Sequence, residues 1–418
     1  MVNETIRQNE SNIERSTKSI ADVVIKEDIQ MIVDRALGSS YTIISYALQQ
    51  FPGKNLGFMA AHRNLIVTVY NETVGQEEEH SFFVKSMPYG VDSQVSLIED
   101  AGAFRKETTY YNKMVPELVA SVEDSVWGAE CFLVKNDVMV FENLKSKNFN
   151  IKEKFLDIRF VKAALLALAK LHSASILTEE RLGKNLLELY PEILTDRLYL
   201  REGKTYDWCL AGVEVAIAVA KHLKLDFTLI RQVCDRVYEA ILPSKSMRNG
   251  ICHGDMWSYN LLFDDSKPLP KCLMVDYQII RYAPIMTDVS LLFYLTTRRI
   301  FRKQYETELL TYYHEALCKK LKENHYQAEL PTLNSIFYEF EQIRIVGIVT
   351  ALLYFPIILL EGEESSDSTK SSDNYVKLQF RDRVGVVLDV IQKDMIYREK
   401  IKEIVEEIVE RAENLLAA

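Results

Sequence analysis

Residues 252–260 of the chain read CHGDMWSYN, and residues 275–278 read VDYQ. The polar side chains that stand out are Asp255, Asn260 and Asp276, the first two of them five residues apart on one segment. The triplet HGD alone arises often by chance. HGD followed at this spacing by Asn, and then by an apolar run that ends in Asp, is much more specific. This combination is the starting point for predicting both fold and chemistry.

The chain between the two motifs has the pattern of a β-hairpin. Two short strand-like runs, Asn260–Phe263 and Cys272–Val275, are separated by a polar turn that contains Pro268. Apolar runs joined by such a turn are typical of paired antiparallel strands. The hairpin would bring Asp276 back beside Asp255 and its neighbours on the first segment.

These three side chains have the chemistry that phosphoryl transfer to a hydroxyl requires. That reaction depends on positioning and charge neutralisation more than on covalent chemistry. Asp255 can accept or orient the proton of the attacking hydroxyl, and it is the predicted catalytic residue. Asn260 and Asp276 offer the hard oxygen ligands that Mg²⁺ prefers. We therefore predict that they hold the Mg²⁺ that accompanies ATP.

Strand signals dominate the chain before residue 142. A helical pattern at Phe104–Met114 lies among four β-branched or aromatic runs, which are Leu65–Tyr70, Ser81–Lys85, Cys131–Val134 and Val138–Phe141. After Glu142, long segments carry apolar residues at helical spacing. We predict an α+β fold, with a small antiparallel β-sheet lobe that carries one key helix and a larger, mainly helical lobe.

The two motifs also carry a resemblance to a known family. HGDMWSYNLLF and CLMVDYQIIRYAP, at 253–263 and 272–284, resemble the phosphotransferase branch of the two-lobed protein-kinase-like fold. Within that branch, Trp257 and the Arg281-Tyr282 pair resemble the ecdysteroid kinase-like (CHK kinase-like) family. The resemblance implies an ATP-dependent small-molecule kinase whose acceptors are steroid-type alcohols such as ecdysteroids.

The sequence patterns divide the chain into three regions, and the resemblance implies the roles of the two lobes. Residues 1–30 are expected to be a helical lead-in, 31–141 the small nucleotide-binding lobe, and 142–418 the large catalytic and substrate lobe.

A lysine and a glutamate upstream match the nucleotide-binding pattern of such kinases. The resemblance implies that Lys85, at the end of a strand, holds the α/β-phosphates of ATP and that Glu107, on a helix, holds that lysine. Taken alone, Lys85 would be an ordinary solvated lysine and Glu107 a surface charge. With the downstream motif present, the functional interpretation is favoured.

The phosphate-covering loop and the lobe connection are weaker signals. Gly57 is the best candidate in GKNLGFMA, residues 53–60, because glycine lets backbone N–H groups approach phosphates closely. Glu142 and Leu144 lie where the resemblance places the backbone groups that bind adenine, and an ordinary strand-to-loop transition explains them equally well.

Two further residues match positions that support the active-site loops. His172 lies in LAKLHSA, residues 168–174, and is predicted to buttress the segment that carries Asp255 rather than to act as a catalyst. Asp288 matches a family aspartate that braces the same loops, and it is also a natural acidic residue for a helix N-terminus.

Composition limits the other classes of function. The net charge of −10 argues against nucleic acid as the main partner, because phosphate backbones select basic faces. The six cysteines are scattered, and the N-terminal residues lack an apolar signal segment. The apolar run Ile345–Leu360 is short for a membrane span and is predicted to be a buried helix. We expect a cytoplasmic monomer or weak dimer.

Two alternatives remain open at this stage. A choline, ethanolamine or aminoglycoside-type kinase would use the same catalytic residues on a cationic acceptor. A pseudokinase would bind its ligand without turnover, although the complete set of candidate residues disfavours it. A protein kinase is disfavoured because HGD replaces HRD and no APE-type segment follows Asp276.

Overall fold

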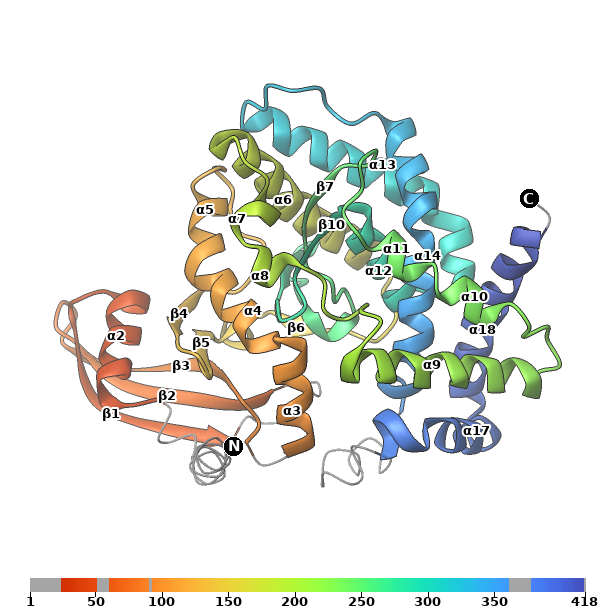
Figure 1. Cartoon of the computed structure of the whole chain (residues 1–418). Coiled ribbons are helices and arrows are strands. Elements are labelled where there is room, and N and C mark those ends of the chain that lie inside the picture. Colours follow the sequence, from red (N-terminus) through yellow and green to blue (C-terminus); the bar gives the residue numbers. More distant parts are fainter. Residues whose placement is uncertain (1–23, 51–59, 90–91, 361–376, 417–418) are drawn as a thin grey trace, which may run out of the picture. The chain divides into compact units, whose positions relative to one another are not determined.

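The computed structural model of the chain describes residues 24–50, 60–89, 92–360 and 377–416, and it forms two compact units (Figure 1). One unit comprises the chain up to Glu99 together with Ala129–Lys147, and the other comprises Asp100–Gly128 and Asn148–Ala418. The first contains a five-stranded antiparallel sheet, and the second is mainly helical. The predicted α+β class is confirmed.

The first unit is built on one sheet with the strand order β1-β2-β3-β5-β4. Leu65, Val67 and Val69 of β2 are buried and alternate with more exposed residues, as expected for a strand with one core-facing side. Helix α2 adds Ile29 and Ile32 to the same core. The elements of this unit are α2 (Lys26–Leu37), β1 (Tyr41–Gln50), β2 (Ala61–Asn71), β3 (Gln76–Ser86), most of α3 (Asp92–Ala101), β4 (Cys131–Val134), β5 (Val138–Glu142) and the 3-10 turn Leu144–Lys147.

The second unit packs helices around two small sheets. Its long central helices, α12 and α14, contact each other, and α6 contacts α13. The elements are α4 (Ala103–Thr109), a π-helical turn (Tyr110–Met114), α5 (Val115–Val119), β6 (Asn150–Ile151), α6 (Ile158–Leu182), α7 (Leu186–Leu189), α8 (Pro191–Leu194), α9 (Gly203–His222), α10 (Ile230–Cys234), α11 (Val237–Ala240), β7 (Asn249–Cys252), a 3-10 turn (Ser258–Asn260), β8 (Leu261–Asp264), β9 (Lys271–Met274), β10 (Arg281–Pro284), α12 (Met286–Thr296), α13 (Arg299–Glu323), α14 (Leu333–Ile358), a π-helical turn (Lys377–Arg381), α17 (Arg383–Lys393) and α18 (Met395–Leu416).

One expected boundary lies inside an observed helix, and one predicted helical segment belongs to the second unit. Helix α2 runs across residue 30, where the expected lead-in ends. The helical segment predicted at Phe104–Met114 is present as α4 and a following π-helical turn, but residues 100–128 belong to the second unit.

Strand pairing in the second unit brings two loops together. β7 and β10 are antiparallel, with Cys252 opposite Arg281. β8 and β9 form the predicted hairpin, with Leu261 opposite Met274. The connection from β7 to β8 and the connection from β9 to β10 therefore start and finish at neighbouring points. This pairing places the two sequence motifs side by side.

Two described helices, α6 and α14, are long and apolar enough to cross a membrane by length and composition. Most of each apolar window is buried inside the protein, at 78% for α6 and 72% for α14, which is usual for core helices. The run predicted as a buried helix, Ile345–Leu360, lies mainly in α14, and its side chains are largely buried.

Candidate active site

Asp255 lies in the connection that follows β7, and only 6% of the residue is exposed. The side-chain amide of Asn260 donates to its Oδ2 at 2.9 Å and to its backbone carbonyl at 3.0 Å. The other carboxylate oxygen, Oδ1, is buried without a close hydrogen-bond partner among the described residues, and the Tyr354 hydroxyl lies near the carboxylate. A buried acceptor left in this way is costly, so an under-satisfied carboxylate indicates a place where a ligand would bind.

Asn260 is held with its amide nitrogen towards Asp255. A backbone carbonyl can only accept, so the contact with the Asp255 carbonyl fixes which end of the amide faces that residue. Its oxygen consequently points away from Asp255 and can serve as a cation ligand. The backbone carbonyl of Asn260 accepts from Val275 N–H at 3.0 Å, and this bond ties the two motifs together.

Asp276 directly follows Val275 and has an unusual backbone conformation. Its φ is +71°, in the left-handed region that few residues other than glycine adopt. Strain of this kind persists only where surrounding structure imposes it, and it concentrates at functional sites. Asp276 is half-buried, and its negative charge acts on Asp255.

The electrostatic surroundings make Asp255 a stronger base than an ordinary aspartate. Burial first, and then the negative charge of Asp276, raise the pKa of Asp255 to about 7. Asn260 and the hydroxyl of Tyr354, on α14, act in the opposite direction. Tyr354 belongs to this site although no motif marked it.

A second aspartate holds the backbone on the other side of the loop. The carboxylate of Asp288, in the first turn of α12, accepts from His253 N–H at 2.7 Å and Gly254 N–H at 2.9 Å. The ring of His172 lies 3.2 Å from Asp288 through Nε2 and 2.7 Å from the Tyr313 hydroxyl through Nδ1. Burial alone would raise the pKa of Asp288, but His172 holds it below its usual value. The contacts match the predicted bracing roles of His172 and Asp288.

Glu107 contacts the second motif through the backbone. It is 1% exposed on α4 and accepts from Tyr277 N–H at 3.2 Å. The Tyr277 ring stacks on Tyr110 at 4.2 Å and lies 4.5 Å from His253. Glu107 and the residue after Asp276 are therefore joined within the second unit.

The remaining predicted residues belong to the first unit. Lys85 is 3% exposed on β3, opposite Met139 of β5. Glu142 accepts from Glu130 N–H at 2.8 Å and pairs with Lys147 at 2.5 Å, and Leu144 is buried in the turn that follows.

Gly57 lies outside the described residues. The pairing of Lys85 with Glu107 and the nucleotide-binding roles of Gly57, Glu142 and Leu144 stay predictions.

The donor set fits a magnesium-bound nucleotide. The amide oxygen of Asn260 and the carboxylate of Asp276 are hard donors of the type that Mg²⁺ selects. Asp255 adds a buried acceptor with a raised pKa at the same place. A Mg²⁺ held by Asn260 and Asp276 would neutralise phosphate charge, and Asp255 can take up a proton from a hydroxyl.

The chain resembles several solved kinase structures at low sequence identity. No curated protein matches the sequence. Among solved structures, an ethanolamine kinase from Plasmodium vivax is 13% identical, with 89% of each chain covered and a TM-score of 0.38. A choline kinase from Streptococcus pneumoniae is 12% identical, with 87% of this chain and 99% of that chain covered and a TM-score of 0.37. An ADP-bound aminoglycoside phosphotransferase is 12% identical, with 77% and 99% covered and a TM-score of 0.32.

The family of the chain follows from its sequence. The sequence profile of the ecdysteroid kinase-like family matches residues 57–326, which is more than half of the chain and includes both motifs. The chain therefore belongs to the ecdysteroid kinase-like family of small-molecule phosphotransferases.

Proposed function

We propose that this protein transfers the γ-phosphate of ATP to a hydroxyl group of a steroid-type alcohol, with Asp255 as the catalytic base. One observation carries the assignment of Asp255 as the base. Oδ1 of Asp255 is a buried acceptor without a close partner among the described residues, although the Tyr354 hydroxyl lies near the carboxylate, and the other oxygen is held by Asn260. An incoming hydroxyl would supply the missing donor.

In this mechanism the alcohol oxygen forms a bond to the γ-phosphorus while the bond to the β-phosphate oxygen breaks and ADP leaves. The alcohol proton passes to Asp255. A base is most effective when its pKa lies near the working pH, and burial beside Asp276 gives Asp255 that property. The hydrogen bond from Asn260 keeps the carboxylate oriented.

Asn260 and Asp276 would hold Mg²⁺, which neutralises negative charge on the phosphates during the transfer. For the nucleotide we propose that Lys85 contacts the α/β-phosphates and Glu107 orients Lys85. Gly57 would approach the phosphates, and the chain at Glu142 and Leu144 would line the adenine site. Glu107 supports this proposal because it also accepts from the backbone beside Asp276.

Aromatic side chains near Asp255 support an apolar ring system as the acceptor. Tyr354 acts on Asp255, and its ring packs edge-to-face on Trp208 of α9 at 5.8 Å. Such surfaces with a few polar groups are typical of small-molecule sites. The guanidinium of Arg383 already lies over Trp208 at 4.9 Å. A cationic acceptor such as choline would compete with Arg383 for that ring face, so an uncharged alcohol is favoured.

A panel of acceptors tests the proposal. Ecdysteroids and other sterols, amino-alcohols and aminoglycosides would be incubated with the protein, ATP and Mg²⁺. ADP formation and the mass of the product would be measured, with Asp255→Asn as the matched control. Phosphorylated sterol formed by the wild type alone is the expected result.

Other outcomes would redirect the proposal. Product from amino-alcohols or aminoglycosides only would replace the steroid acceptor with a cationic one. Mg²⁺-dependent nucleotide binding without any product would indicate a ligand-binding pseudokinase.

A further inference from the structure

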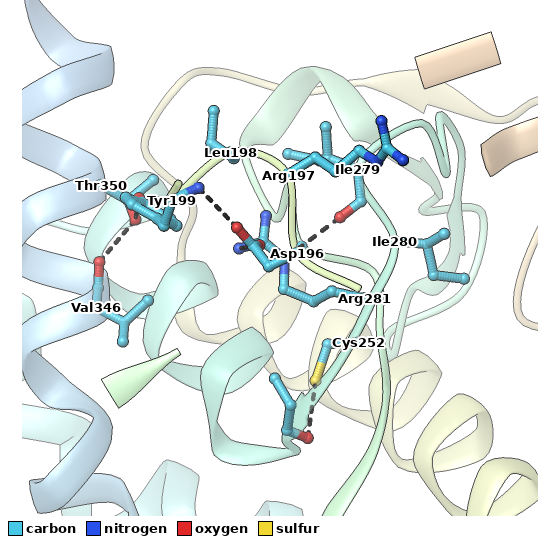
Figure 2. A network of polar contacts seen from close by, with 12 residues as sticks. Asp196, Arg197, Leu198, Tyr199, Cys252, Ile279, Ile280, Arg281, Val346 and Thr350 are labelled. Carbon is cyan, nitrogen blue, oxygen red and sulfur yellow. Dashed lines mark hydrogen bonds and ion pairs between the residues drawn. The ribbon is translucent and has the colours of Figure 1, made fainter. Parts of the chain in front are cut away.

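Arg281 and Asp196 form a buried ion pair that the reaction chemistry does not itself require, and Figure 2 shows both side chains. Arg281, the first residue of β10, contacts Asp196 with 2.5 Å between Nη1 and Oδ2, and the two side chains are 2% and 9% exposed. Asp196 lies between α8 and α9. Burying two charges is expensive, and apolar residues of similar size can replace such pairs without loss of stability. Stability alone therefore gives no reason for the pair.

The guanidinium of Arg281 lies against the residue that precedes the base. A Cβ atom built on Gly254 would lie 3.0 Å from Nε and 3.2 Å from Nη2 of Arg281, and 2.5 Å from the carbonyl oxygen of Ile279. Arg281 Nε also donates to that carbonyl at 3.3 Å. Gly254 has a φ of +82°. The tight turn before Asp255 is thus packed directly on Arg281.

Asp196 is anchored to helix α14. Its Oδ1 accepts from Tyr199 N–H at 2.6 Å, and the Tyr199 hydroxyl lies 2.6 Å from Thr350 Oγ1 on α14 (Figure 2). The Arg281 guanidinium also faces the Tyr199 ring, 5.7 Å from its centroid. The position of Arg281 is therefore tied to a long core helix.

A third element joins the same segment. Lys106, next to Glu107 on α4, donates to the carbonyl of Thr195 at 2.8 Å and to the carbonyl of Ile280 at 2.9 Å. Lys106 thus holds the two residues that directly precede the members of the ion pair. These are Thr195, before Asp196, and Ile280, before Arg281. The pair is held at both ends.

We propose that the Arg281–Asp196 pair is a positioning device that fixes the turn at Gly254 and thereby sets the location of the Asp255 carboxylate. The proposal rests on the proposed role of Asp255 as base. Asp288 holds this turn through its N–H groups, and Arg281 supports it from the side where a Cβ would clash. A displacement of about 1 Å at a reacting group can reduce turnover about 10²-fold.

A double variant separates positioning from stability. Arg281→Met or Asp196→Asn alone leaves one buried charge without its partner, so each should lower the melting temperature. The double variant removes both charges and should regain much of that loss. We expect its kcat to stay about 10²-fold below the wild type, with the KM for ATP within about twofold. A double variant with wild-type kcat would overturn the proposal.

A conservative variant and a distant pair supply the controls. Arg281→Lys keeps the charge but loses the planar fork of arginine, so we expect a folded protein with kcat lowered about tenfold and an unchanged KM for ATP. Wild-type kcat in this variant would also overturn the proposal. The buried Arg302–Glu407 pair joins α13 to α18. Arg302→Lys and the Arg302→Met/Glu407→Gln double variant should keep the wild-type kcat.

A measurement without substrate distinguishes this proposal from the proposed function. Hydrogen–deuterium exchange of a peptide covering residues 252–260 should be faster in the Arg281→Met/Asp196→Asn protein than in the wild type and in the Arg302→Met/Glu407→Gln control. Equal exchange in all three proteins would refute the positioning role whatever the acceptor is. Failure of the wild type to phosphorylate any acceptor, with faster exchange in the first variant, would refute only the proposed function.

Discussion

Asp255 and Asp288 are buried aspartates at the same turn, the one formed by His253 and Gly254, yet their surroundings differ. Asp288 receives two backbone N–H groups and contacts His172, and its pKa is held low. Asp255 receives the Asn260 amide on one oxygen, and its pKa is raised. Folding therefore stabilises the anionic form of Asp288 and disfavours the anionic form of Asp255. Asp288 is a carboxylate that holds structure, whereas Asp255 is prepared for a ligand.

The largest expected effect comes from Asp255→Asn. Removing the base should lower turnover by roughly 10²–10⁴-fold while ATP still binds. The melting temperature should stay the same or rise, because the change removes a buried charge beside Asp276. Steady-state kinetics with the identified acceptor and thermal unfolding would measure both. Near-normal turnover would show that Asp255 is not the base, and the functional difference between Asp255 and Asp288 would no longer hold.

Asp288→Asn is the matched change on the other side of the turn. Asparagine can accept with one oxygen, so its amide group would face a backbone donor of His253 or Gly254. Breaking this buried charged cluster should destabilise the protein by roughly 3–5 kcal/mol. Denaturant unfolding compared with Asp255→Asn would measure it. Equal stability of Asp288→Asn and Asp255→Asn would show that the backbone hydrogen bonds to Asp288 do not make it more important for stability than Asp255.

Gly254→Ala tests the turn between the two aspartates. The new Cβ would lie 2.5 Å from the carbonyl oxygen of Ile279 in a backbone conformation that disfavours alanine. We expect a stability loss of about 1–3 kcal/mol and turnover lowered about 10²-fold. Gly183→Ala is the control, because Gly183 also has a positive φ, +62°, but nothing lies within 4 Å of its Cβ position. Similar turnover in both variants would contradict the proposed tight packing.

Lys106→Met should have the smallest effect on turnover, and its effect on stability should depend on pH. Burial lowers the pKa of Lys106 to about 7, with Asp196 opposing and with Arg281 and Arg197 contributing. Between pH 7 and the usual lysine pKa, the unfolded chain binds more protons than the folded one, so this lysine makes stability rise with pH.

The measurement for Lys106 is a difference between two proteins. Unfolding of the wild type and of Lys106→Met would be followed at pH 7 and pH 9. The wild type should gain up to about 1.4 kcal/mol per pH unit relative to the variant. Parallel pH dependence in the two proteins would show that Lys106 does not titrate in this range.

The sequence by itself determined the fold class, the family and the approach of the two motifs. Strand and helix patterns are local, and the hairpin that returns Asp276 towards Asp255 is encoded in one short run of residues. The spacing of HGD, Asn and Asp was specific enough to predict the chemistry. The cytoplasmic location and the monomeric or weakly dimeric state stay predictions.

Only the tertiary structure decided how the site is supported. Asp196, Lys106 and Tyr354 reach the motifs from distant parts of the chain, and contacts between such segments leave no periodicity or spacing in the sequence. The left-handed backbone of Asp276 is equally invisible there, because the surrounding packing imposes it on a residue that would otherwise avoid it. Local patterns specify elements, whereas burial and charge at a site depend on which elements meet.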